Sequence, residues 1–202
     1  MSDAARDGGT IRGEDWYGDD LGAVRHTGTT FVDVDLSEVS TSGAYFEGCV
    51  FRGCRFNAST HVSTAFVACT FDGTSFFDAT LEGCKLTGSV FNSCVMRPLR
   101  VRGGNWSGVT LRGAKLSRLD LTDVDLREAD LSLADLSAAV LRGCRLDGAV
   151  IRETDLTNAD LRGASLDRVD LTSARLGGTR LDLLGAVLLA ELSGAVVDLG
   201  EP

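Results

Sequence analysis

An apolar residue recurs at every fifth position of this chain, from Ile11 to Leu181, without a slip of frame. Of these 35 positions 32 are apolar, and the exceptions are His26, Thr41 and His61. A helix turns by about 100° per residue, so a five-residue spacing scatters apolar side chains around it, and a straight strand places alternate ones on opposite faces. The pattern therefore predicts a chain that turns a corner after every few residues and keeps each fifth side chain inside.

The neighbouring positions complete a repeating unit. The residue two before each central position is mostly small, and the residue two after it is often glycine, which suits turns with unusual backbone angles. All six cysteines fall at the small position: Cys49, Cys54, Cys69, Cys84, Cys94 and Cys144. We therefore expect reduced thiols that fill the core.

Segments such as "ADLSLADLSAAVL" and "TDLTNADLRGASL" make the sequence resemble the pentapeptide-repeat family. The resemblance implies an all-β fold, a right-handed quadrilateral β-helix in which four units form one coil. Such a coil would stack Cys49 and Cys69 on adjacent coils of one face, so a disulfide between them is the alternative to free thiols. Thirty-five units then give about nine coils, a rod of roughly 42 Å at a spacing of about 4.8 Å per coil. We expect a loosely ordered segment over residues 1–10, the β-helix over 11–182 and a cap over 183–202.

The C-terminal segment departs from the repeat, and two alternatives describe it. The repeat continues with a shifted frame through Val187, Leu192 and Val197, or residues 183–192 form a short helix that ends near Gly194, before a last strand "AVVDL". We favour the helix, because leucines recur there at four-residue spacing. In both cases surplus apolar surface predicts a two-fold dimer. The expected interface consists of Leu183, Leu184, Val187, Leu188, Leu192 and Val196.

Catalytic chemistry has no support in the sequence. With only two histidines, His26 and His61, both at core positions, the chain shows no catalytic triad, zinc-ligand spacing or phosphate-binding loop. We expect a protein that is not an enzyme and has no cofactor or metal. Pro98 lies at a turn position, where it forms either an ordinary corner or a kink or cis bond near the middle of the rod.

The net charge of −9 is unevenly distributed and argues against direct nucleic-acid binding. Residues 1–50 carry a net −7, whereas residues 51–100 carry +2. An acidic band consists of Asp120, Asp123, Asp125, Glu128, Asp130 and Asp135. A secondary acidic patch consists of Glu14, Asp15, Asp19, Asp20, Asp33 and Asp35. Both are candidate partner-binding surfaces, although an aspartate before the central leucine can also accept turn N–H groups.

Neither end of the chain resembles a targeting or membrane segment. The start "MSDAARDGGT" has no apolar region, and the apolar run over 183–190 is too short to span a bilayer. We therefore expect a cytoplasmic protein that does not contact membranes.

Within the family, the stretch Cys94–Leu99, the preceding Gly88–Phe91 and the apolar cap are similar to the MfpA- and Qnr-type proteins. That resemblance implies a homodimer that imitates double-stranded DNA, binds DNA gyrase and modulates or protects it against fluoroquinolones or another topoisomerase poison. The unbroken frame leaves no room for loops projecting from the coils. The alternative is a scaffold or interaction module unrelated to topoisomerases.

Bulk charge limits the DNA imitation. Duplex DNA carries about one charge per 1.7 Å, whereas nine net charges over roughly 42 Å give about one per 5 Å. An imitation of DNA must therefore depend on local acidic stripes and on the shape of the rod.

Overall fold

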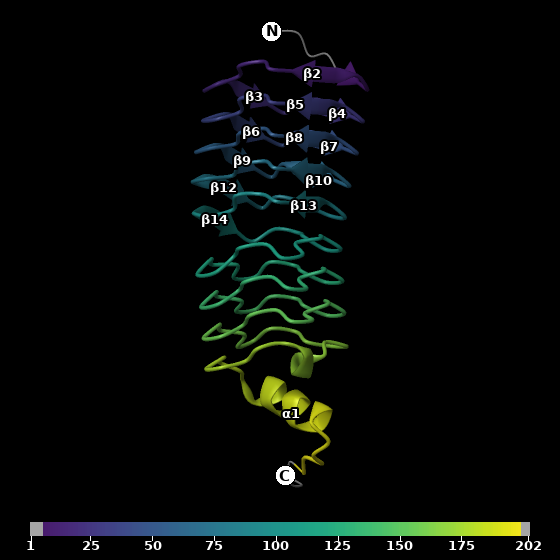
Figure 1. Ribbon diagram of the computed structural model, residues 1–202, viewed down its shortest axis with the longest axis vertical. Helices are drawn as coiled ribbons and strands as arrows, with labels where there is room; N and C mark the ends of the chain where they lie inside the picture. Colours follow the sequence, from purple (N-terminus) through teal and green to yellow (C-terminus); the bar gives the residue numbers. More distant parts are fainter. Residues whose placement is uncertain (1–5, 199–202) are drawn as a thin grey trace.

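The computed structural model describes residues 6–198 as a rod of stacked coils that ends in a helix (Figure 1). The strands are β1 Arg6–Asp7, β2 Thr10–Arg12, β3 Asp20–Gly22, β4 Arg25–Thr27, β5 Thr30–Val32, β6 Ser40–Ser42, β7 Tyr45–Glu47, β8 Val50–Arg52, β9 Thr60–Val62, β10 Ala65–Val67, β11 Thr70–Asp72, β12 Ala79–Glu82, β13 Val90–Asn92 and β14 Leu99–Arg102. A 3-10 helix, η1, spans Leu171–Ser173, and the helix α1 spans Leu183–Leu192.

The coil has four faces, which we number in chain order. The first carries the parallel sheet β1-β4-β7-β10, the second β2-β5-β8-β11-β13 and the fourth β3-β6-β9-β12-β14. The third is held by isolated parallel bridges such as Asp15 to Asp35. Each residue pairs with the one 20 positions further on, as Phe31 does with Phe51, so four five-residue units close one coil.

Regular strands account for about five turns of this β-solenoid, and isolated bridges continue the 20-residue step to Arg180. No loop is inserted between Arg6 and Arg180, in agreement with the unbroken frame of the sequence. The predicted all-β repeat fold with a short C-terminal cap is confirmed. β1 lies within the segment 1–10 that the sequence assigns to a loosely ordered start, and residues 1–5 lie outside the described part.

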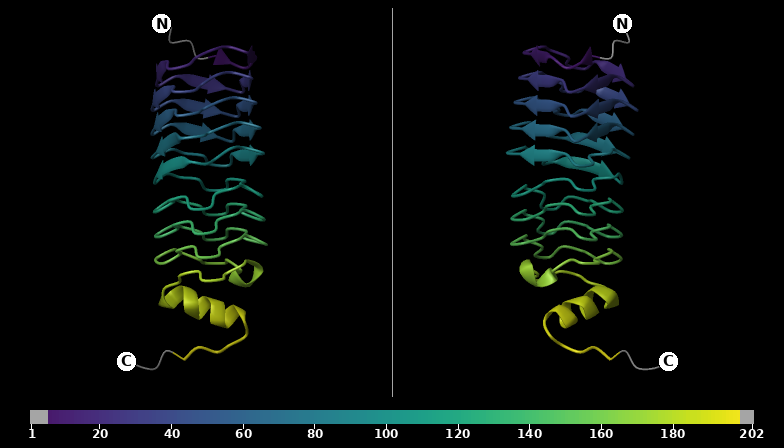
Figure 2. Two further views of the ribbon diagram at one scale, coloured as in Figure 1. Left: turned by 60° about the vertical axis from the view of Figure 1, so that its left-hand side comes forward. Right: turned by 90° about the vertical axis from the view of Figure 1, so that its right-hand side faces the viewer.

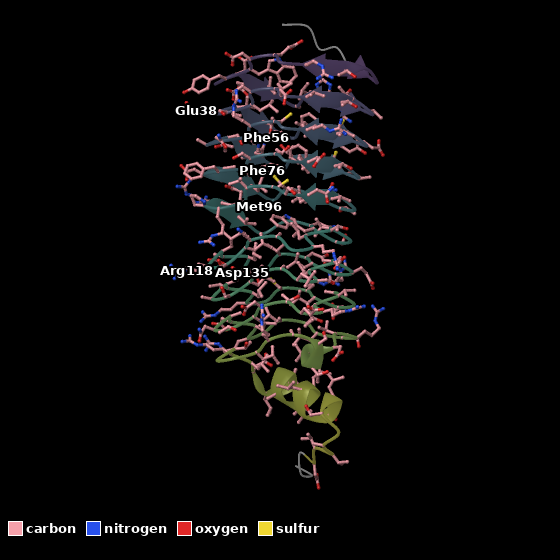
Figure 3. All side chains as sticks on the ribbon, viewed as in Figure 1. Glu38, Phe56, Phe76, Met96, Arg118 and Asp135 are labelled. Atoms are coloured by element: carbon pink, nitrogen blue, oxygen red, sulfur yellow. The ribbon has the colours of Figure 1, made fainter. Side chains whose placement is uncertain are left out.

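The central residues of the units form the core. Phe51 and Phe71 stack with ring centroids 4.9 Å apart, and Phe71 and Phe91 stack at 4.6 Å. Phe56 and Phe76 stack in the same way on the next face, above Met96 (Figure 3). From Leu111 onward the buried column consists of leucines and one isoleucine. A 20-residue step therefore places like side chains directly over one another, which favours offset ring stacking.

The polar residues of the core have the partners expected of buried groups. His61 is fully enclosed, and its Nδ1 lies 2.7 Å from the Thr41 hydroxyl and its Nε2 3.0 Å from the Ser59 hydroxyl. Burial lowers the pKa of the His61 imidazole to about 4. The cysteines are all free thiols, so the alternative of a Cys49–Cys69 disulfide is excluded.

The C-terminal segment forms a helix, and the shifted repeat is excluded. Asp182 caps α1 by accepting a hydrogen bond from the Gly185 N–H at 3.0 Å, and Gly194 follows the helix with a positive φ of 89°. The helix lies across the last coil (Figure 2). At Gly185 a side chain would meet Leu181 at 3.3 Å, which explains why the helix can approach so closely there. The expected strand "AVVDL" is wrong for residues 195–198, which form no ladder.

Pro98 follows a cis peptide bond from Arg97, one of the alternatives that the sequence left open. It lies just before β14, at the corner between the third and fourth faces.

Candidate interaction surfaces

The aspartate that precedes each leucine of the acidic band holds its own turn. Asp120 accepts a hydrogen bond from the Thr122 N–H at 3.0 Å, and Asp130 accepts one from the Ser132 N–H at 2.9 Å. Asn105 accepts the equivalent bond from the Ser107 N–H at 3.0 Å. These carboxylates therefore have a structural role that an amide oxygen also fills.

The acidic band does not form a single patch, because consecutive units lie on consecutive faces. Asp125 lies on the first face, Asp130 on the second and Asp135 on the third, and Asp120 precedes them on the fourth. Asp123 and Glu128 occupy the corners in between, with φ values of 60° and 56°. The six residues therefore form a girdle around the rod.

Part of this girdle is neutralised by nearby arginines. Asp125 lies 2.7 Å from Arg127 and 3.7 Å from Arg145, and the hydrogen bond from Arg127 lowers the pKa of its carboxyl. Glu128 pairs with Arg168 at 3.0 Å. The other four acids of the band have no Lys or Arg within salt-bridge distance among residues 6–198: Asp120, Asp123, Asp130 and Asp135. Asp135 nevertheless interacts with Arg97 and Ser117, so Asp120, Asp123 and Asp130 are the carboxylates most available to a partner.

The secondary patch is more compact, because stacking brings its members together at the end of the rod. Asp15 and Asp35 are bridged partners on the third face. Asp35 also pairs with Arg55 at 2.8 Å, and the hydrogen bond from Arg55 lowers the pKa of Asp35 to about 2. Next to them the Tyr17 hydroxyl donates to Glu38 at 2.6 Å, which places an additional carboxylate beside the patch (Figure 3).

The remaining acids of the patch belong to the same end. Glu14 accepts a hydrogen bond from the Trp16 indole N–H at 2.7 Å, and Asp20 accepts one from the Ser40 hydroxyl at 3.0 Å. Asp19 is exposed on the first coil, and Asp33 sits at a corner with a positive φ of 53°.

The C-terminal helix exposes part of the apolar surface that the sequence assigned to a dimer interface. The exposed members are Leu183 (69%), Leu184 (76%), Leu192 (43%) and Val196 (97%). Leu188 differs, because it packs against the core of the last coils, and Val187 is half-buried. The helix thus uses one side to close the solenoid and leaves the other uncovered.

A basic zone lies in the middle of the rod, where the sequence predicted only a net +2 over residues 51–100. Between Glu82 and Asp120 the chain has no acidic residue and seven basic ones. They are Lys85, Arg97, Arg100, Arg102, Arg112, Lys115 and Arg118. Charge counted over residues 51–100 and 101–150 conceals this zone, because the boundary divides it and the acidic band offsets its second part.

Two of these cations are paired with the coil before them. Arg100 lies 2.8 Å from Asp78, and Arg102 lies 3.3 Å from Glu82. The other five form no salt bridge within the described chain. Residues 6–198 contain no group of three potential metal ligands and no helix long and apolar enough to cross a membrane.

Two protein-family models match parts of this chain. Residues 105–143, 129–167 and 144–182 match the family model of pentapeptide repeats, and residues 21–96 match that of the SV2A/B/C luminal domain. A search of curated proteins finds no match.

Solved structures of QnrB1, described as a plasmid-mediated fluoroquinolone resistance protein, are similar to the whole rod. A trypsin-treated form is 22% identical, with a TM-score of 0.65 over 96% of this chain and 100% of that one. The full-length form is also 22% identical, with a TM-score of 0.61 over 93% of this chain and 100% of that one. Residues 105–182 therefore match the model of pentapeptide repeats, and the whole rod has a fold similar to that of QnrB1.

Proposed function

We propose that this protein is a cytoplasmic, non-catalytic homodimer that imitates duplex DNA, binds DNA gyrase and modulates or protects it against fluoroquinolones or another topoisomerase poison. The observation that carries the proposal is the similarity to QnrB1 over almost the entire rod. The rod also has no inserted loop between Arg6 and Arg180, so its contacts with the enzyme would come from the coil surface itself.

The available carboxylates support contact with a basic DNA-binding surface. Asp120, Asp123, Asp130 and Asp135 form no salt bridge within the described residues, although Asp135 interacts with Arg97 at longer range, and the four surround one coil. At the tip, the secondary patch adds stacked acids. Close charge pairs across an interface provide specificity and fast association that weaken as salt is added.

The dimer is proposed through α1. Leu183, Leu184 and Val196 expose apolar surface at the end of the rod, where a two-fold axis would cover it with the same surface of a second copy. The acidic patches would then lie at the two far tips, and the rod would double to roughly 80–90 Å.

Gyrase supercoiling with purified protein and a fluoroquinolone titration tests the proposal. The wild-type protein should change supercoiling or drug sensitivity at micromolar concentration, and the effect should decline as salt rises. A variant with Asp120, Asp123, Asp125, Asp130 and Asp135 changed to Asn should need about tenfold more protein for the same effect. Asn retains the acceptor that the turns require, as Asn105 shows, so this variant should remain folded.

The matched control neutralises five other carboxylates. Asn at Asp15, Asp19, Asp20, Asp33 and Asp35 removes the same charge from the tip, and the two variants together separate a girdle contact from a tip contact. Wild-type activity in both folded variants would remove acidic contacts from the mechanism.

A second candidate is an interaction module unrelated to topoisomerases. The basic zone favours it, because seven cations without an acid interrupt the acidic surface in the middle of the rod. Supercoiling that is unchanged at micromolar protein, with or without drug, would support this alternative.

A further inference from the structure

The solenoid contains one step at which adjacent coils are not joined on the third face. On the N-terminal side of this step the Val95 N–H donates to the Thr74 carbonyl at 3.0 Å. On its C-terminal side the Asp135 N–H donates to the Ala114 carbonyl at 2.9 Å. The intervening bond, from the Lys115 N–H to the Cys94 carbonyl, is not formed.

The fourth face is open at the same step. The Val140 N–H donates to the Leu119 carbonyl at 2.9 Å, but no bond joins the Asp120 N–H to Leu99. Regular bonding ends at Phe91, whose N–H donates to Thr110 at 3.0 Å, and it resumes at Trp106, whose N–H donates to Asp125 at 2.7 Å. We call this opening, between residues 93–103 and 112–122, the seam.

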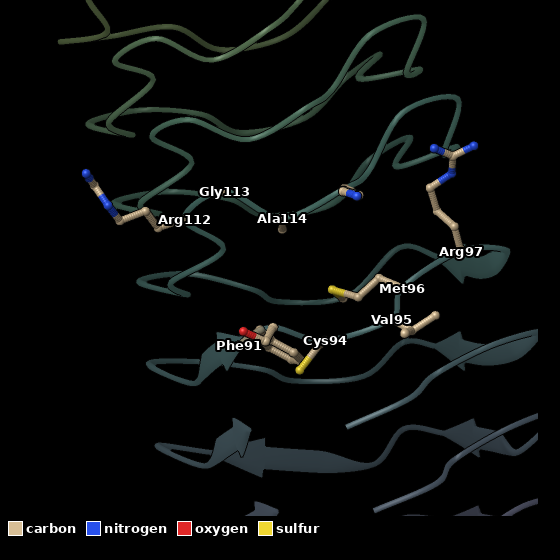
Figure 4. A pocket seen from close by; sticks show the side chains of 10 residues that line it. Phe91, Cys94, Val95, Met96, Arg97, Arg112, Gly113 and Ala114 are labelled. Atoms are coloured by element: carbon tan, nitrogen blue, oxygen red, sulfur yellow. The ribbon is translucent and has the colours of Figure 1, made fainter. Parts of the chain in front are cut away.

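A cavity of about 390 Å³ lies in the seam on the third face (Figure 4). Its floor is apolar, formed by Phe91, Cys94, Met96 and Ala114. Cys94 and Ala114 are partly exposed there, whereas Cys54 and Ala134, at the same position of other coils of this face, are buried. Between Cys54 and Ala134, the seam therefore exposes part of the core on this face, whereas the coils on either side of the seam keep it buried.

Cations surround this apolar floor. Arg112 and Arg97 stand on opposite sides of it, and Lys115 completes the rim (Figure 4). None of the three forms a salt bridge within residues 6–198. Arg97 donates to the Ser117 hydroxyl across the seam. Asp135 on the next coil accepts hydrogen bonds from Ser137, and its carboxylate also interacts with Ser117 and with Arg97, so Arg97 is partly compensated within the chain.

Backbone donors are available at the same place. The amides of Met96 and Lys115, which would bond across the step in a regular coil, have no hydrogen-bond partner within the described chain. Unsatisfied N–H groups beside three cations and an apolar floor together fit an anionic head on an apolar body.

We propose that the seam cavity binds a small carboxylic acid with an apolar, planar or branched body. The carboxylate would lie beside Arg112 and Lys115 and accept the free backbone donors, and the body would cover Cys94, Met96 and Ala114. A cavity of about 390 Å³ falls within the range of small-molecule sites, about 300–1,000 Å³. This proposal does not depend on the proposed gyrase binding.

Titration with 2-naphthoate, followed by calorimetry, tests the proposal on the full chain. We expect saturable binding at one site per chain, and at least about tenfold weaker binding of the uncharged 2-naphthamide. A variant with Arg112→Gln and Lys115→Gln should bind naphthoate at least about tenfold more weakly. The matched control, Arg152→Gln with Arg180→Gln, removes two exposed cations far from the seam and should bind within about twofold of wild type.

Cys94 provides a second measurement that does not depend on the variants folding. It is the one partly exposed cysteine, so alkylation by N-ethylmaleimide should modify it first, and bound naphthoate should slow that modification in the wild-type protein. No saturable binding below about 1 mM, equal binding of the amide, or an alkylation rate of Cys94 unaffected by saturating naphthoate would each overturn the proposal. Binding of an acidic peptide in place of naphthoate would also overturn it.

Discussion

The two halves of the rod share one 20-residue step but build their walls differently. Before Gly103 three faces carry strands, and stacked phenylalanines fill much of the core. After it the ribbon has no regular strands (Figure 2), and isolated bridges take their place. Leucines fill the core of this half. The five-residue period therefore sets how the coils stack. The length of the hydrogen-bonded strands, in contrast, depends on the residues around each central side chain.

The residue before the central one differs between the halves on the second face, but it does not by itself set the strand length. The strand half has Val50, Thr70 and Val90 at this position, and β-branched residues favour extended backbone. The leucine half has Asp130 there, whose carboxylate binds the turn N–H two residues later, but also Thr110 and Val150, which form only isolated bridges. Asp20 accepts the same kind of turn bond, from the Gly22 N–H, and still begins β3.

Removing one central side chain from each half should give the largest effect. Phe71 and Leu131 occupy the same place on the second face, three coils apart, and both are fully buried. We expect Phe71→Ala to lower the free energy of unfolding by about 3–5 kcal/mol and Leu131→Ala by about 2–4 kcal/mol. The phenylalanine also loses its stacking on Phe51 and Phe91. Urea unfolding measures both, and a smaller loss for Phe71 would contradict the role of the aromatic column.

Acid should weaken the strand half first. The pKa of His61 is lowered to about 4 by burial, whereas an unfolded histidine titrates near pH 6.5, so the unfolded chain binds the extra proton between these values. Stability should therefore fall by up to about 3 kcal/mol as the pH drops from about 6.5 to about 4. Hydrogen exchange at pH 6.5 and 5 should show this loss around His61, with little change around Leu141 on the same face.

The control for this prediction is His61→Gln, which keeps a polar side chain between Thr41 and Ser59 but does not titrate. It should reduce the difference in stability between pH 6.5 and 5. An unchanged pH dependence in this variant would assign the effect to other groups.

The turn aspartates should give the smallest effect. Asp130→Ala removes the acceptor for the Ser132 N–H and should destabilise the rod by about 1 kcal/mol, whereas Asp130→Asn keeps the acceptor and should be nearly neutral. Thr70→Ala, at the equivalent position of β11, removes no turn acceptor and should change stability mainly through strand propensity, by less than about 1 kcal/mol. Equal losses for the Asn and Ala variants of Asp130 would show that charge, not the turn bond, is the stabilising feature.

Much of the fold could be predicted because the repeat leaves little freedom. The five-residue period places the cysteines inside, and the four units per coil that the resemblance implies place Phe71 over Phe51. The helix over 183–192 also followed from leucine spacing, but the strand after it did not form, because residues 195–198 pass beyond the last coil and have no edge with which to pair.

The surfaces were harder to predict. The acidic band is continuous in the sequence, but four units close one coil, so Asp125 and Asp135 lie on opposite faces. The seam at Cys94 and Lys115 interrupts no part of the five-residue pattern, and only the absence of acids between Glu82 and Asp120 marks its surroundings. A repeat determines where side chains point but not where two coils separate.

Competition between this protein and duplex DNA for gyrase tests the central claim most directly. Fluorescence anisotropy of labelled DNA bound to gyrase should fall as unlabelled protein is added, and the displacement should weaken steeply with salt. The variant with Asn at Asp120, Asp123, Asp125, Asp130 and Asp135 should displace DNA about tenfold less effectively. If gyrase binds neither the wild-type protein nor its variants, or binds protein and DNA together without mutual displacement, the rod does not act as an imitation of DNA.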